Sequence, residues 1–132
     1  MAVTVGWDNP EHTVLLYDFS ETWTWEELFR AAQEDDSLLE GIEHTVHQIF
    51  DMQKTRMIPS NPLARMENLA HEIRPTIGLM IFVGGTLWFQ TIVDIFHNFF
   101  LSRIAGVKGL HFVKSVDEGR AIIAQYGLEQ VG

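Results

Sequence analysis

Residues 77–101 are the most constraining stretch of this 132-residue chain, and they read IGLMIFVGGTLWFQTIVDIFHNFFL. Its strongly polar side chains are Gln90, Asp94, His97 and Asn98. A membrane-spanning helix needs about 20 consecutive apolar residues, whereas this apolar run ends near residue 89. Gly84 and Gly85 divide the run, and Thr86 is placed to cap a following helix. The stretch therefore predicts a strand buried on both faces and then an amphipathic helix, with no transmembrane segment.

The helix expected over residues 87–101 has a wide apolar face. Its apolar arc covers roughly 160°, where a surface helix needs about 100°. Six residues of this arc are candidates for a ligand or partner surface: Trp88, Phe89, Ile92, Val93, Phe96 and Phe100. Three interpretations stay open, since the arc can be covered by the sheet, by a partner subunit or by an apolar ligand. For an identical partner, we expect a homodimer with contacts at Phe89, Val93, Phe96 and Phe100.

The rest of the chain alternates between strand and helix signals. Thr24 and Glu27 have the spacing of a capping box, as do Ser115 and Glu118, and each pair predicts a helix start. Trp25 belongs to the apolar stripe of its helix and is expected in the core. The expected elements are strands 3–7 and 13–19, helix 25–40, strand 45–52, a helix from residue 62 to before residue 75, strand 77–83, helix 87–101, strand 110–114, and a helix from 115 to about 126 that Gly127 ends.

The order of these elements is β-β-α-β-α-β-α-β-α, which predicts an α/β fold. The two strands before residue 20 are close enough to form an antiparallel hairpin. The later alternation predicts right-handed crossovers, and so a single mixed, mostly parallel sheet of about five strands with four helices. We expect one domain over residues 1–132, with strand 77–83 at the centre of the sheet.

Charge and composition exclude several classes of protein. The chain has a net charge of −9, and its acidic residues concentrate in the first 53 positions. An acidic chain without a basic stripe repels phosphate backbones, so we expect no nucleic-acid partner. The chain has no cysteine, which excludes disulfides and thiolate chemistry. The first residues lack the pattern of a signal peptide, and we expect a cytoplasmic protein.

The sequence contains no strong catalytic or metal-binding motif. The six histidines lack ligand spacing, so we expect neither a metal nor a cofactor. Asp18 and Asp51 lie near the ends of expected strands, where open α/β sheets bind ligands, and two carboxylates there suit acid–base chemistry. No nucleophile accompanies them, which favours helix capping or loop bonding. We therefore expect a protein that is not an enzyme and keep an enzyme using Asp18 or Asp51 as an outlying alternative.

The loop KTRMIPSNPLARM places three cations in an otherwise acidic molecule: Lys54, Arg56 and Arg65. They serve either to keep the surface soluble or to form a cationic rim that steers an acidic partner or ligand head group.

Four segments carry a resemblance to a known family: TWTWEEL at 22–28, IFDM at 49–52, IFVGG at 81–85 and FVKSVDEGRAIIAQYG at 112–127. In this order and spacing, the chain resembles the SpoIIAA-like STAS domains, which have the anti-sigma-factor-antagonist fold. The resemblance implies a mixed sheet with packed helices, cytoplasmic residence, and a regulatory or binding role. The same broad fold resembles the CRAL-TRIO lipid-transfer domains, which keep an apolar ligand under their helices.

The chain departs from the phospho-regulated STAS proteins at one place. Those proteins carry an Asp-Ser or Asp-Thr pair, whereas here Asp51 is followed by Met52 and Gln53. Thr55 and Ser60 lie in the same loop and are the candidates for phosphorylation.

Besides the outlying enzyme, the sequence leaves two functions as hypotheses. The first, which the resemblance favours, is a non-enzymatic STAS-like regulatory module that binds other proteins. The second is a carrier of an apolar small molecule or lipid in a pocket under the aromatic helix 87–101.

Overall fold

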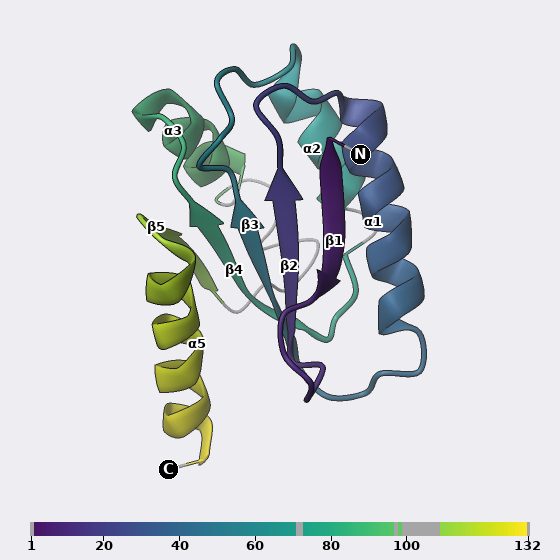
Figure 1. Ribbon diagram of the computed structural model, residues 1–132, viewed down its shortest axis with the longest axis vertical. Helices are drawn as coiled ribbons and strands as arrows, with labels where there is room; N and C mark the ends of the chain where they lie inside the picture. Colours follow the sequence, from purple (N-terminus) through teal and green to yellow (C-terminus); the bar gives the residue numbers. More distant parts are fainter. Residues whose placement is uncertain (1, 71–72, 97, 99–108, 132) are drawn as a thin grey trace.

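The computed structural model describes residues 2–70, 73–96, 98 and 109–131 (Figure 1). These residues form an α/β fold with one five-stranded mixed sheet and four helices, in the predicted order. The strands are β1 Val3–Trp7, β2 Val14–Phe19, β3 Val46–Asp51, β4 Ile77–Val83 and β5 Gly109–Val113. The helices are α1 Trp25–Leu39, α2 Pro62–Ala70, α3 Leu87–Phe96 and α5 Val116–Val131.

The strands lie side by side in the order β1-β2-β3-β4-β5. β1 is antiparallel to β2, and every later neighbour is parallel. The middle strand is therefore β3, and the prediction that strand 77–83 is central was wrong by one position. All seven residues of β4 are buried, because helices cover both of its faces. β3 is also buried along nearly its whole length. His47 and Gln48 interrupt its apolar pattern, so the sequence did not indicate that β3 is the middle strand.

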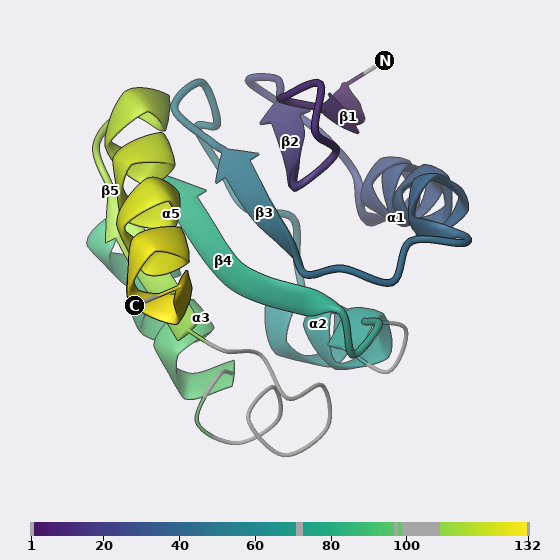
Figure 2. The same cartoon turned by 90° about the horizontal axis from the view of Figure 1, so that it is seen from below.

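The helices divide unequally between the two faces of the sheet. Each parallel connection moves one strand further in the same direction, so right-handed crossovers place α1, α2 and α3 on the same face. Figure 2 shows α1 and α2 on the side of the sheet away from α5. A large buried cluster lies under the first three helices, and a smaller one, which includes Ile49 and Ile81, packs against Ile122 and Ile123 of α5.

Local signals set the bounds of α1. The Thr24 side chain accepts a hydrogen bond from the Glu27 backbone N–H at 3.2 Å, and Glu27 Oε1 accepts one from the Thr24 N–H at 3.0 Å. This reciprocal pair confirms the predicted capping box. The helix ends at Leu39, one residue before the expected end, and Gly41 lies two residues further on with a φ of +82°.

The predicted break between β4 and α3 is confirmed. Gly84 and Gly85 adopt φ values of +78° and +91°, which L side chains rarely tolerate. Thr86 Oγ1 accepts a hydrogen bond from the Phe89 N–H at 3.1 Å and caps α3. Residues 99–108, which include the end of the expected helix 87–101, lie outside the described part of the chain. Within the described ranges, none of the helices combines the length and apolar character needed to cross a membrane.

The last helix is longer than predicted. Ser115 Oγ accepts a hydrogen bond from the Glu118 N–H at 3.1 Å, so the expected start is confirmed. The helix continues through Gly127 to Val131, and the predicted end at Gly127 was wrong. A glycine inside a helix costs only about 1 kcal/mol relative to alanine, which is too little to end the helix by itself.

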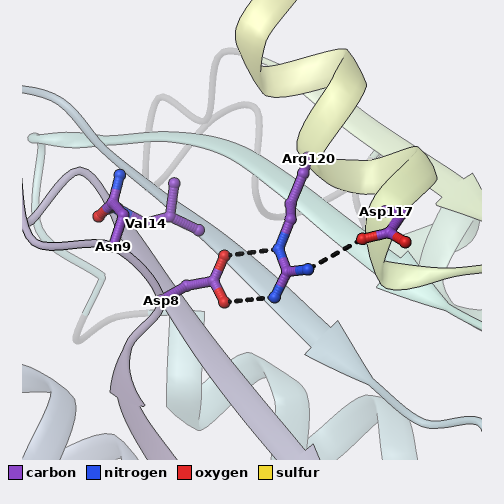
Figure 3. A network of polar contacts seen from close by, with 5 residues as sticks. All are labelled: Asp8, Asn9, Val14, Asp117 and Arg120. Carbon is purple, nitrogen blue, oxygen red and sulfur yellow. Dashed lines mark hydrogen bonds and ion pairs between the residues drawn. The ribbon is translucent and has the colours of Figure 1, made fainter.

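An ion-pair network joins the start of α5 to the turn after β1 (Figure 3). Arg120 donates through Nε and Nη2 to the two carboxylate oxygens of Asp8, at 2.9 and 2.7 Å, and through Nη1 to Asp117 at 2.9 Å. The hydrogen bonds to Asp8 raise the pKa of Arg120. This two-pronged contact connects residues 112 positions apart in the sequence.

Candidate ligand pocket

A pocket of about 640 Å³ lies between the sheet and the three helices α1, α2 and α3. Its volume falls within the range of roughly 300–1,000 Å³ that is usual for small-molecule sites. Seven of its wall residues are aromatic: Tyr17, Phe19, Trp23, Trp25, Phe50, Phe82 and Phe89. Leucine, isoleucine, methionine and valine side chains supply most of the remaining wall.

The aromatic wall is held by ring packing. Phe50 stacks on Phe82 with centroids 4.9 Å apart, and Tyr17 packs against Phe50 at 4.7 Å. Trp23 and Trp25 meet edge to face at 5.1 Å. Both indoles are buried, which confirms the expected core position of Trp25. Aromatic pairs at such separations add stability beyond their burial, so the wall is preformed.

Both indole N–H groups have partners in the loop between β3 and α2. Trp25 Nε1 donates to the Ser60 carbonyl oxygen at 2.7 Å, and Trp23 Nε1 donates to Thr55 Oγ1 at 3.3 Å. Thr55 in turn donates to the Ser20 carbonyl oxygen at 3.2 Å. The two candidates for phosphorylation therefore help to position the pocket wall.

A polar cluster of three residues interrupts the apolar wall. Asp35 comes from α1, Tyr17 from β2 and Gln48 from β3, and all three are buried. The Tyr17 hydroxyl and Gln48 Nε2 both donate to Asp35 Oδ2, the latter at 2.6 Å. Asp35 Oδ1 and Gln48 Oε1 have no hydrogen-bond partner among the described residues. The cluster thus holds two buried acceptors that can still receive a donor.

Burial controls the ionisation of this cluster. It raises the pKa of Asp35 to about 6, although the hydrogen bonds from Tyr17 and Gln48 act in the opposite direction. Burial, followed by the nearby Asp35 charge, also raises the pKa of Tyr17 well above its usual value. At neutral pH the pocket wall therefore carries one buried carboxylate charge beside a neutral phenol.

Sequence reasoning did not single out Asp35. The spacing of Asp35 could have indicated that it is buried. It lies seven residues after Leu28 and four before Leu39, on the apolar stripe of α1. Leu28, Ala31 and Leu39 are buried on the same stripe. A carboxylate in the middle of such a stripe must find partners inside the protein, whereas its neighbour Asp36 is exposed.

The structure describes the side chains of only some of the α3 residues that were candidates for a ligand or partner surface. Phe89 and Val93 are buried and line the pocket, and Ile92 is buried beside them. The side chains of Trp88 and Phe96, and the whole of Phe100, lie outside the described part.

The expected homodimer stays a prediction. Phe89 and Val93, two of its four expected contacts, are enclosed within a single chain, with exposed fractions of 4% and 0%.

The three cations of the expected rim each lie near a different group. Lys54 Nζ is 3.9 Å from Asp18 Oδ2, and Arg56 forms an ion pair with Glu21. The guanidinium of Arg65 lies 6.0 Å from the centre of the Phe29 ring. None of the three is on the pocket wall.

The cation on the wall is Arg74, which sequence reasoning did not select. Its Nε donates to Asp36 Oδ1 at 2.7 Å, and its Nη2 donates to the Asp36 carbonyl oxygen at 3.3 Å. This pairing lowers the pKa of Asp36 and makes the pair electrically neutral as a unit.

Asp18 and Asp51 lie opposite each other at the ends of β2 and β3. Asp51 Oδ1 accepts hydrogen bonds from the Gln53 backbone N–H at 3.2 Å and from Gln53 Nε2 at 3.0 Å, which is the loop bonding that we expected. Neither aspartate lines the pocket. Across the described residues, no group of three or more histidine, aspartate or glutamate side chains is arranged to hold a metal ion.

No protein-family model, curated protein or solved structure matches this chain. The resemblance to SpoIIAA-like STAS domains therefore stays a prediction from sequence motifs.

Proposed function

We propose that this chain is a non-enzymatic binding protein that carries an apolar small molecule in the pocket beneath α1, α2 and α3. The observation that carries the proposal is a pocket of about 640 Å³ whose wall is mainly aromatic and aliphatic. Sites of this size and composition usually bury most of a small ligand, and a few polar groups orient it.

The polar groups of the wall are suited to binding. Tyr17, Asp35 and Gln48 form a hydrogen-bonded set of a phenol, a carboxylate and an amide, which can hold the polar end of a ligand. The two aspartates that we considered for acid–base chemistry lie away from this pocket. These positions favour a carrier over an enzyme.

The pocket also favours a carrier over the STAS-like module that binds other proteins. The carrier hypothesis placed the ligand under helix 87–101, and α3 supplies Phe89 and Val93 to the wall. Most of the wall comes instead from α1, the sheet and α2. Protein binding and cytoplasmic residence remain expectations from the family resemblance.

Binding of the neutral apolar dye Nile red tests this proposal, together with native mass spectrometry of protein purified without denaturation. We expect one dye molecule per chain, and a copurified small molecule in the native mass. Ala32 lines the pocket, so Ala32→Phe should place a ring in the ligand volume and weaken dye binding about ten-fold, or roughly 1.4 kcal/mol.

Ala124→Phe is the matched control, because Ala124 is exposed on α5, across the sheet from the pocket. Circular dichroism of both variants checks that they fold. The proposal fails if the native protein binds neither dye nor ligand, or if Ala32→Phe and Ala124→Phe bind the dye as well as the native protein does.

A further inference from the structure

The polar cluster on the pocket wall specifies the charge of the ligand. We propose that the pocket recognises an apolar amine, whose ammonium group is held by Asp35 on α1 and Gln48 on β3. This inference rests on the proposed function and adds the chemical class of the ligand.

The hydrogen-bond inventory of the cluster favours a donor. The hydroxyl proton of Tyr17 and an amide proton of Gln48 are already donated to Asp35 Oδ2. Asp35 Oδ1 and Gln48 Oε1 are buried acceptors without a partner among the described residues. A buried polar atom that is left without a hydrogen bond is costly, so a ligand that supplies donors gains most here. An ammonium group has only donors and can serve both oxygens.

The charges around the cluster favour a cation. Asp35 has an exposed fraction of only 5%, and its neighbours Tyr17 and Gln48 carry no charge. The nearest cation on the wall is Arg74, and it is paired with Asp36 at 2.7 Å. Arg74 and Asp36 act on the Asp35 carboxyl with opposite signs, so Asp35 is a buried carboxylate without an ion-pair partner among the described residues, and an ammonium ion would neutralise it.

The aromatic wall adds to this preference. The faces of aromatic rings attract cations, most strongly where water is excluded. Tyr17 hydrogen-bonds Asp35 and packs against Phe50 at 4.7 Å, so aromatic rings lie beside the carboxylate. A carboxylic acid ligand would instead meet the negative charge of Asp35.

The pH dependence of binding follows from Asp35. Burial raises the pKa of this carboxyl to about 6, so it is mainly ionised at pH 7.5 and mainly protonated at pH 5.0. A primary amine, with a pKa of about 10, stays protonated at both values. We therefore expect amine binding to weaken about ten-fold between pH 7.5 and pH 5.0, while binding of a neutral ligand stays constant.

Three eight-carbon probes that differ only in their polar end test the inference: octylamine, 1-octanol and octanoate. Displacement of Nile red at pH 7.5 should show octylamine binding about ten-fold tighter than octanol, with octanoate weakest. Asp35→Asn should remove the advantage of octylamine and leave octanol within about two-fold. Glu34→Gln removes an exposed charge from the same helix and should change neither affinity.

The outcomes separate this inference from the proposed function. Equal binding of the three probes, or tightest binding of octanoate, would overturn the amine assignment and leave an apolar carrier. Failure of all three probes and of Nile red to bind would refute both. The pH series on the native protein gives an independent reading if Asp35→Asn does not fold, and an octylamine affinity that does not change between pH 7.5 and 5.0 would also overturn the assignment.

Discussion

Replacement of Asp35 by asparagine should stabilise the empty protein at neutral pH. The pKa of this carboxyl is about 6 in the folded chain and 3.8 in the reference state. Because one pKa unit corresponds to about 1.36 kcal/mol, the buried charge costs about 3 kcal/mol at pH 7.5 and only about 1 kcal/mol at pH 4.5. Because the pKa of this carboxyl is higher in the folded chain, its protonation stabilises the fold. This contribution to the free energy of unfolding is fully present below pH 3.8, the reference pKa, and is lost as the pH rises through about 6, the folded pKa.

Asparagine keeps an acceptor for Tyr17 and Gln48 and removes the charge. We expect Asp35→Asn to raise the free energy of unfolding by about 1–3 kcal/mol at pH 7.5, with a gain smaller by about 2 kcal/mol at pH 4.5. Urea denaturation followed by tryptophan fluorescence measures both values, and Glu34→Gln controls for a general loss of negative charge. A loss of stability at pH 7.5 would refute the reasoning, because the hydrogen bonds of the carboxylate would then outweigh its desolvation. A gain independent of pH would refute it as well, because ionisation of Asp35 would then not be the source of the gain.

Three further substitutions test the packing, each by urea denaturation. Trp25→Ala should cost about 3–5 kcal/mol, as truncation of a large buried side chain does, and a loss below about 1 kcal/mol would place the indole at the surface. Arg120→Lys cannot reproduce the two-pronged pairing at the β1–β2 turn and should cost roughly 1 kcal/mol, less at high salt; an unchanged stability would contradict this. A Cβ at Gly78 would lie 2.7 Å from a ring nitrogen of His47, so Gly78→Ala should lower the free energy of unfolding by about 1–3 kcal/mol. Gly6→Ala is the control, because a Cβ at Gly6 would have no atom within 4 Å and would cause no clash.

The order and type of the elements could be predicted because their signals are local. The capping box at Thr24 and the glycine pair at 84–85 act through neighbouring backbone groups, and the sequence displays these directly. The prediction that the last helix ends at Gly127 was wrong for the opposite reason, because that signal is not local. A glycine ends a helix where the chain adopts a left-handed turn, and that turn depends on the residues after the glycine and on the packing of the whole helix.

The pocket could not be predicted from the same signals. Phe89 and Val93 were identified as apolar positions of a wide arc, but their burial depends on how α1 and α2 sit on the same face of the sheet. In the sequence, residue type alone does not distinguish Asp35 from the acidic residues on either side of it. Its role depends on Tyr17 and Gln48, which reach it from positions 18 and 13 residues away.

The topology gives a physical reason for a pocket on this face of the sheet. Three successive right-handed crossovers place α1, α2 and α3 over the same face, while α5 covers the other. All three helices contribute side chains to the wall beneath them, from Trp25 of α1, Met66 of α2 and Phe89 of α3 among others. Large rings from β2, β3 and β4 fill part of the space beneath them, and about 640 Å³ remains. Phe89 and Val93 of α3 therefore meet an interior with room for a ligand, and Asp35 puts a charge at its wall that a ligand of opposite charge would neutralise.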